Sequence, residues 1–191
     1  MTSNYLDRRE FTAAVLAERG DTLVVPSLGA PTWDCAAAGL TAEALHSWGG
    51  MGLALATALG VALAQPNRRV LCLNGDGEMM MGLGTLAVVG DQAPSNLAIL
   101  VLDNEHFGET GGQPGLARTA DFCAIAKGAG IPRTMNVTAM EQVPALTDML
   151  FHQPGPCLAT SKIALGDFPL TMPEKHGPSI AAAFRATATN P

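Results

Sequence analysis

Two short polar clusters contain the residues best suited to chemistry. Gly75-Asp76-Gly77 and Asp103-Asn104 each come directly after an apolar run of strand length. An acid between glycines would repel a bare phosphate unless a divalent cation lies between them. Carboxylate and amide oxygens, together with phosphate oxygens of a bound molecule, are the ligands that Mg²⁺ prefers. We therefore predict a site in which Mg²⁺ bridges Asp76 and Asn104 to a diphosphate.

The two clusters need elements that bring them together. Apolar strands are predicted over residues 22–26, 69–74, 96–102, 134–137 and 156–161, and helices over residues 6–19, 53–64, 78–89, 120–128, 141–151 and 179–187. The remaining long segments, 27–48 and 105–115, are interpreted as loops. Strands that alternate with helices predict an α/β fold. We expect one domain over residues 1–191, a doubly wound, mainly parallel sheet with helices on both faces.

Ligands of such sheets bind at the carboxyl ends of the strands, which is where both clusters lie. A purely structural alternative stays open for the first cluster, because a Gly-Asp-Gly turn with the acid as helix cap is common. The pairing with Asp103-Asn104 at the next strand end, 28 residues after Asp76, favours the metal site.

Composition excludes some classes of partner. The chain has a net charge of −6, so no basic field exists to attract nucleic acid or an anionic membrane surface. Only 15% of the residues are charged, which indicates that part of the surface is covered by another subunit.

Cysteine spacing and the termini point to a cytoplasmic protein. Cys35, Cys72, Cys123 and Cys157 show no paired spacing and are predicted to be reduced core thiols. The polar N-terminus (MTSNYLDRRE) is unlike a signal peptide. The uncharged stretch 44–67 contains several glycines, His46 and a proline, so we interpret it as a loop and buried helix rather than a membrane span.

Residues 75–104 (GDGEMMMGLGTLAVVGDQAPSNLAILVLDN) resemble the motif of thiamine diphosphate-dependent enzymes, which begins with Gly-Asp-Gly and ends with Asn-Asn. Asp103 stands where the family has the first asparagine. The resemblance implies that Mg²⁺ is held by Asp76, Asn104, the backbone carbonyl of His106, two diphosphate oxygens and a water.

Two further segments resemble the phosphonopyruvate and sulfopyruvate decarboxylases of this family. They are SWGGMG (residues 47–52), in which Gly50 replaces a serine, and TGGQP (residues 110–114). In the first segment, Met51 matches the apolar residue that holds the cofactor in its bent shape. The resemblance places the cofactor against Gly50, Met51, Gly75, Gly77, Glu78, Thr110 and Gly111.

The resemblance implies a split enzyme. The family's full-length members carry two α/β domains, and this chain matches the one that binds the diphosphate. It therefore looks like the β subunit of a decarboxylase that converts a 2-oxo acid to CO₂ and an aldehyde. The partner would be an α subunit with the pyrimidine-side domain and the activating glutamate. The alternatives are half of a carboligase similar to acetolactate synthase, half of an oxidoreductase, or a cofactor-binding module without catalysis.

A catalytic side chain and the substrate are less clearly indicated. His46 lies four residues before Gly50, and its imidazole suits proton transfer, although a capping or interface role is an alternative. No lysine or arginine occurs between Arg69 and Arg118. The second anion of a sulfopyruvate- or phosphonopyruvate-like substrate would then need a cation from the α subunit, unless the substrate is a simpler 2-oxo acid.

Overall fold

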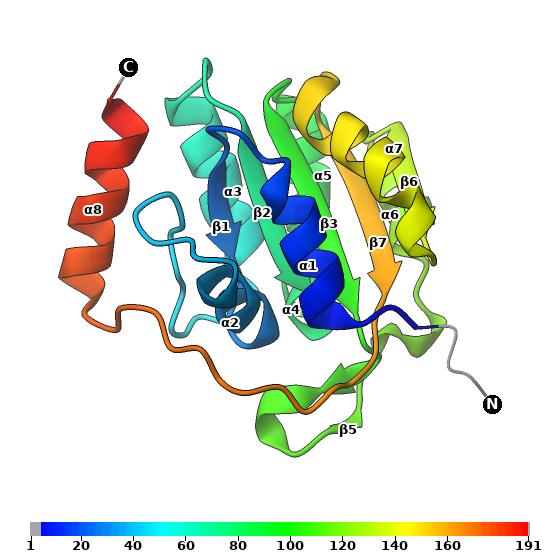
Figure 1. Ribbon diagram of the computed structural model, residues 1–191. Coiled ribbons are helices and arrows are strands. Elements are labelled where there is room, and N and C mark those ends of the chain that lie inside the picture. The colour runs from blue at the N-terminus through cyan, green and yellow to red at the C-terminus, as the bar shows by residue number, and fades with distance from the viewer. Residues whose placement is uncertain (1–4, 191) are drawn as a thin grey trace.

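Five parallel strands form the central sheet in the order β1-β2-β3-β7-β6 (Figure 1). They are β1 (Leu23–Pro26), β2 (Val70–Gly75), β3 (Leu97–Asp103), β7 (Cys157–Lys162) and β6 (Arg133–Val137). The computed structural model describes residues 5–190, so the first four residues of the polar N-terminus lie outside it. Every pair in this sheet is parallel, and β1 to β3 are buried almost throughout.

Helices cover both faces of the sheet, as predicted. One core cluster joins the sheet to α1 (Arg8–Ala17), α2 (Ala30–Ala37) and α7 (Val143–Thr147). The other joins it to α3 (Ala54–Ala64), α4 (Asp76–Met81), α5 (Thr85–Gln92), α6 (Phe122–Gly128) and α8 (Gly177–Thr189). Side chains alternate between the two clusters along each strand, for example Leu71 and Cys72, because strand side chains have a period of two. The doubly wound fold is confirmed.

Two segments predicted as loops contain regular structure, so those predictions were wrong. Residues 27–48 include α2, which begins at a proline-containing turn where Thr32 Oγ1 donates to the Ser27 carbonyl at 2.9 Å. Residues 105–115 form a small antiparallel pair, β4 (His106–Phe107) and β5 (Gln113–Pro114). The single-turn helices are Gly108–Thr110, Ala117–Thr119, Met140–Gln142 and Asp148–His152. Dense glycine and proline made α2, β4 and β5 look irregular in the sequence, whereas Met140–Gln142 and Asp148–His152 flank α7 within the region of the helix predicted over residues 141–151.

The helix predicted over residues 78–89 is two helices, α4 and α5, separated at Gly82. The physical reason is a close contact between backbones: a Cβ at Gly82 would lie 2.3 Å from the Gly52 carbonyl oxygen. The glycine-rich loop before α3 therefore packs directly against the end of α4. This contact holds Met51 beside the start of that helix, where a Cβ at Gly77 would lie 3.2 Å from the Met51 methyl group.

The segment 163–176 leaves β7, passes under the carboxyl ends of the strands and leads to α8 (Figure 1). The chain before α1 pairs with its start, since the Leu6 amide donates to the Lys162 carbonyl and the Ala164 amide to the Leu6 carbonyl. Asp7 then caps α1 by accepting from the Glu10 amide at 2.8 Å. The first turn of α1 is thereby fixed beside the carboxyl edge of the sheet.

All four cysteines are free and buried, which confirms the prediction of reduced core thiols. Within residues 5–190, no helix is both long enough and apolar enough to cross a membrane.

Candidate functional site

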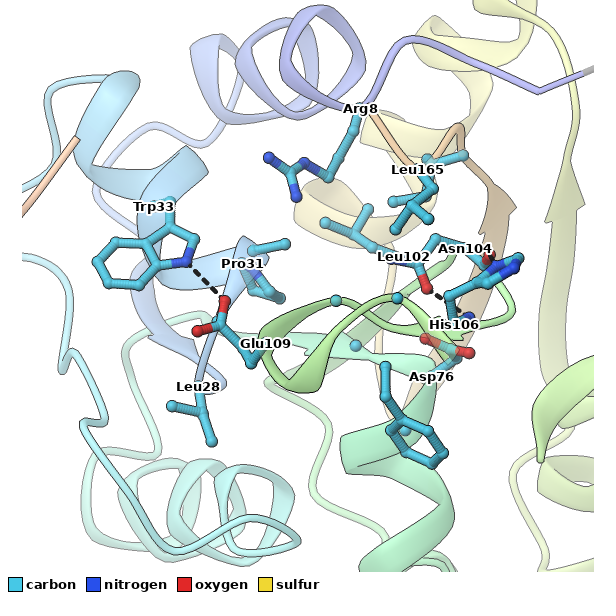
Figure 2. Close-up of a pocket in the computed structure, with 18 of the residues that line it drawn as sticks. Arg8, Leu28, Pro31, Trp33, Asp76, Leu102, Asn104, His106, Glu109 and Leu165 are labelled. Atoms are coloured by element: carbon cyan, nitrogen blue, oxygen red, sulfur yellow. Dashed lines mark hydrogen bonds between the residues drawn. The ribbon is translucent and has the colours of Figure 1, made fainter. Parts of the chain in front are cut away.

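The two polar clusters leave the sheet side by side. β2 and β3 are neighbours, with Asn74 opposite Val101 and Gly75 opposite Leu102, so Asp76 and Asn104 emerge from adjoining strand ends. Both residues line one cavity of about 490 Å³ at the carboxyl edge of the sheet (Figure 2). The predicted adjacency of the two strand ends is confirmed.

Asp76 carries a buried carboxylate, one oxygen of which lacks a hydrogen-bond donor. Its side chain is 3% exposed, and Oδ2 meets no hydrogen-bond donor among the described residues. Burial and the negative charge of Asp103 raise the pKa of Asp76 to about 6. A buried carboxylate oxygen without a partner is costly, and a cation relieves that cost. The Asp76 side chain therefore fits a metal ligand.

Asn104 and His106 add two oxygens of the type that Mg²⁺ prefers. Asn104 Oδ1 accepts from the His106 amide at 2.8 Å, which fixes the side chain at the cavity wall and leaves the oxygen a second lone pair. Pro114 lies opposite His106 in the small sheet and has no N–H to donate to the His106 carbonyl. Residues 5–190 hold no cluster of three or more His, Cys, Asp or Glu suited to a metal. An ion here would rest on one carboxylate, one amide, one carbonyl and oxygens of a bound molecule.

The charge of Asp103 is balanced inside the chain. Asp103 is 1% exposed, and Lys162 Nζ lies 2.7 Å from its Oδ2 and 2.6 Å from Glu105 Oε1. Sequence reasoning missed this pair because Lys162 comes at the end of β7, 59 residues after Asp103. The position directly after an apolar strand was the available signal. The departure from the family's asparagine is thus accompanied by a cation.

The two glycines that flank Asp76 differ in what they contribute: Gly77 allows a close contact, and Gly75 donates a backbone hydrogen bond. A Cβ at Gly77 would lie 2.7 Å from the Phe107 ring, so only glycine fits between Phe107 and Met51. The Gly75 amide donates to Ser27 Oγ at 3.1 Å and is already in use within the protein.

Glu78 is buried, and its Oε1 accepts from the Ala54 amide at 3.0 Å. Its carboxylate thus lies at the N-terminus of α3, where a negative charge is favoured. Gly75, Gly77, Glu78 and Met51 all line the cavity.

The hairpin formed by β4 and β5 contains two of the predicted cofactor-binding residues. One lies in the cavity wall and the other in the turn. Thr110 lines the cavity, and its Oγ1 accepts from Gln113 Nε2 at 2.6 Å. Gly111, with φ of 121°, forms the turn between β4 and β5 and does not line the cavity.

His46 and Gly50 also lie outside the lining of the cavity. His46 is 6% exposed, and burial lowers the pKa of its imidazole. Gly50 has φ of 69°, a backbone conformation that glycine adopts more readily than serine. The roles assigned to His46, Gly50 and Gly111 stay predictions.

Sequence reasoning missed a cation in the cavity wall. Arg8, from the first turn of α1, lines the cavity, and its Nε lies 2.9 Å from Asp34 Oδ2. Arg9 Nε lies 3.1 Å from the other oxygen of Asp34. Across the cavity mouth, Trp33 Nε1 donates to Glu109 Oε1 at 3.0 Å (Figure 2). Arg8 precedes the segments that carry the resemblance, so its position at the cavity could not be predicted from the sequence.

Comparison with known proteins identifies the family. The profile of the thiamine pyrophosphate enzyme C-terminal TPP-binding domain matches residues 37–160. Phosphonopyruvate decarboxylase of Streptomyces viridochromogenes is 38% identical over 144 residues, covering 75% of this chain and 36% of that protein. Sulfopyruvate decarboxylase subunit beta of Methanothermobacter thermautotrophicus is 36% identical over 125 residues, covering 65% and 67%. Acetolactate synthase isozyme 2 large subunit of Escherichia coli is 34% identical over 122 residues, covering 58% and 22%.

A solved structure shows the same fold. A chain from Mycobacterium smegmatis, described as a thiamin diphosphate-dependent enzyme, superposes with a TM-score of 0.68 at 20% identity, covering 85% of this chain and 32% of that one. This chain thus spans about a third of the phosphonopyruvate decarboxylase and about two thirds of the sulfopyruvate decarboxylase β subunit. The family profile includes β2, α4, β3 and the hairpin, which are the elements that place Asp76, Asn104 and His106. The chain therefore belongs to the thiamine pyrophosphate enzymes and corresponds to their C-terminal cofactor-binding domain.

Proposed function

We propose that this chain is the diphosphate-binding β subunit of a split thiamine diphosphate- and Mg²⁺-dependent decarboxylase, which releases CO₂ and an aldehyde from a 2-oxo acid. The observation that carries the proposal is the buried, unpartnered Asp76 oxygen beside Asn104 at adjoining strand ends. Relatives named phosphonopyruvate decarboxylase and sulfopyruvate decarboxylase subunit beta support the reaction class.

In this proposal the chain binds the metal and encloses the reacting groups. Asp76, the Asn104 side chain and the His106 carbonyl hold Mg²⁺, and the amides of Gly77 and Glu78 face the diphosphate. Thiamine diphosphate, when bound, accepts the electron pair released as CO₂ leaves. The apolar part of the wall, which includes Leu28, Met51 and Phe107, excludes water from that electron pair.

The second subunit is part of the proposal. Three sulfopyruvate decarboxylase relatives are named as β subunits, which implies an α partner. Large apolar side chains are exposed around the loops near the cavity: Leu53 is 59% exposed, Met81 64% and Leu116 68%. Such side chains are typical of a surface that a partner covers. The α subunit would bring the pyrimidine-side domain and its glutamate.

The test is reconstitution. The chain is co-expressed with an α-type subunit, binding of thiamine diphosphate with Mg²⁺ is measured by calorimetry, and products from sulfopyruvate, phosphonopyruvate and pyruvate are identified. Free aldehyde with CO₂, formed only by the two-subunit complex, supports the proposal. Full activity of the chain alone as a homo-oligomer overturns the split arrangement.

A carboligase is the second candidate, favoured by the similarity to two acetolactate synthase large subunits of Escherichia coli at 34% and 32% identity. The same product analysis separates the two reactions. A condensed hydroxy acid from two molecules of 2-oxo acid indicates the carboligase, whereas free aldehyde indicates the decarboxylase.

A further inference from the structure

Arg8 is a buried cation whose outer nitrogens have no protein partner. The residue is 9% exposed, and its Nε lies beside Asp34. Neither of its two Nη atoms donates a hydrogen bond to any residue within 5–190, and its Nε forms an ion pair with Asp34 Oδ2 at 2.9 Å without the geometry of a hydrogen bond. Figure 2 shows the guanidinium extending from α1 toward the space enclosed by Trp33, Leu102 and Glu109.

The surroundings hold this side chain in one orientation. Asp34 is 2% exposed and forms ion pairs with Arg8 through one carboxylate oxygen and with Arg9 through the other. Two cations therefore share one carboxylate. The ring of Phe168, from the segment that passes under the sheet, lies 4.9 Å from Arg8 Cζ. The ion pair with Asp34 and the Phe168 ring against the guanidinium leave its two Nη atoms as a pair of donors toward the cavity.

Arg8 is also the one lysine or arginine among the residues that line the cavity. The other charged lining residues are Asp76, Glu78, Glu109 and Asp167, all acids. A cavity with this balance repels anions everywhere except near Arg8 and any bound metal ion. Both kinds of molecule expected here, a diphosphate and a 2-oxo acid, are anions.

We propose that Arg8 is the anion-binding residue of this cavity and that its Nη pair holds two oxygens of one oxyanion. That oxyanion belongs either to the diphosphate or to the acid substrate, a choice that rests on the proposed function. Asp34 and Phe168 act as positioning residues. Where the oxyanion is that of the acid substrate, the cation that was expected from the α subunit is supplied by Arg8 of this chain.

The test measures anion binding directly, by tryptophan fluorescence, because Trp33 lines the same cavity and Trp48 packs against Trp33. The full chain, with its α subunit where the two co-purify, is titrated in one arm with inorganic pyrophosphate and with Mg²⁺-thiamine diphosphate. In the other arm the coenzyme-loaded protein is titrated with phosphonoacetate, a stable dianion. Arg8→Met is expected to raise the Kd in one arm or both by about 10- to 100-fold, the value of a paired charge-assisted contact.

Arg9→Met is the matched control. Arg9 contacts the same Asp34 and the same Phe168 ring, but its Nη2 donates to the Pro169 carbonyl and it does not line the cavity. Its substitution should leave both Kd values within about twofold of the wild type. Should Arg8→Met fail to fold, Arg8→Lys keeps the charge, and a smaller loss of affinity is expected because an ammonium cannot bind two oxygens as a planar pair.

Each result of the two titrations either assigns the anion that Arg8 binds or overturns the proposal. A loss confined to the pyrophosphate and coenzyme arm assigns Arg8 to the diphosphate, and a loss confined to phosphonoacetate assigns it to the substrate. Wild-type affinity of the Arg8 variants in both arms overturns the proposal, as does a wild-type protein that binds neither anion. Coenzyme binding that is independent of Arg8 leaves the proposed function standing. Anion binding through Arg8 without any affinity for thiamine diphosphate removes the proposed function and keeps this assignment.

Discussion

Asp76 illustrates how the site is built from single residues. Its carboxylate is 3% exposed, has one oxygen without a donor, and has a pKa raised to about 6 by burial and by Asp103. Such a group destabilises the metal-free protein, because a buried charge without a partner loses its hydration. The same property gives it high affinity for a cation. Stability and function therefore oppose each other at this residue.

Replacing Asp76 with asparagine should separate these two effects. We expect Asp76→Asn to weaken binding of Mg²⁺-thiamine diphosphate by at least about 100-fold, since the anionic ligand is lost. The free energy of unfolding of the metal-free protein should rise by about 1 kcal/mol, because the uncompensated charge is removed. Calorimetry and urea unfolding measure the two quantities. Asp91→Asn, the same change at an exposed carboxylate, is the control. Unchanged coenzyme affinity in Asp76→Asn would refute the role of Asp76.

Lys162 should contribute to the stability of the fold because it neutralises the carboxylate of Asp103. Lys162→Met leaves the Asp103 carboxylate, 1% exposed, without its cation, and we expect a loss of about 2–3 kcal/mol in the free energy of unfolding. The double variant Asp103→Asn/Lys162→Met removes both charges and should recover more than half of that loss. Urea unfolding of the wild type, the two single variants and the double variant completes the cycle. A double variant no more stable than Lys162→Met would show that Asp103 is not the cause.

The elements act by bringing loops together at the carboxyl edge of the sheet. α4 ends at Gly82 because the Gly52 carbonyl occupies the space that a side chain would need. That contact joins the loop containing Met51 to the helix that begins at Asp76. A substitution at the end of α4 should therefore weaken coenzyme binding.

Gly82→Ala tests this connection. The new methyl group meets a backbone oxygen, so we expect a loss of about 2 kcal/mol or more in stability and weaker coenzyme binding as the loop is displaced. Gly84→Ala is the matched control, because nothing lies within 4 Å of a Cβ there and φ is −60°. Its stability should be equal to the wild type or slightly higher. Differential scanning calorimetry gives the stability, and equal melting temperatures for the two variants would contradict the expected clash.

His46 belongs to the segment between α2 and α3, and burial lowers the pKa of its imidazole below the ordinary 6.5. The unfolded chain then binds this proton more readily than the folded one, so the stabilising effect is complete above pH 6.5 and is lost as the pH falls below it. We expect the difference in unfolding free energy between wild type and His46→Gln to shrink from pH 7.5 to pH 5. Urea unfolding at both values measures it.

The same variant tests the predicted catalytic role of His46. A constant difference between the two proteins at pH 7.5 and pH 5 would show that His46 does not carry the pH dependence of stability. A kcat of the reconstituted enzyme that falls at least about 100-fold in His46→Gln, with unchanged KM, would assign proton transfer to this residue despite its place outside the cavity.

At the scale of the whole molecule, the proposed function makes the chain one part of a larger assembly. Only 15% of its residues are charged, and it spans about a third of the length of a phosphonopyruvate decarboxylase relative. Leu53, Met81 and Leu116 are exposed around the loops at the site. An α subunit seated there would cover these side chains and close the cavity.

Met81→Glu should weaken that association. A charge placed in an apolar contact costs several-fold to a hundredfold in affinity, and we expect the Kd for the α subunit to rise at least about 10-fold with the fold unchanged. Analytical ultracentrifugation of the mixed subunits measures it. Leu63→Glu is the control: Leu63 is 50% exposed but lies at the far end of α3 from the Met51 loop. An equal effect of both substitutions would place the interface elsewhere.

The sequence by itself determined the alternation of strands and helices, the parallel sheet and the pair Asp76 and Asn104. These depend on local information: apolar runs mark buried strands, and polar residues directly after them must lie at the carboxyl edge. β2 and β3 follow each other in the chain and are neighbours in the sheet, so their adjacency could be predicted without knowing the rest of the molecule. Helix α2 and the break at Gly82 were not predicted, because a short helix and a contact with Gly52 leave no periodic pattern in the sequence.

Only the tertiary structure brought Arg8 and Lys162 to the site. Arg8 comes from the first helix, and Lys162 from β7, which lies beside β3 although β6 precedes it in the chain. Their positions depend on the strand order and on the pairing of the chain before α1 with the end of β7. Contacts between segments so far apart are decided by how the whole sheet assembles, and a residue's own neighbours in the sequence carry no record of them.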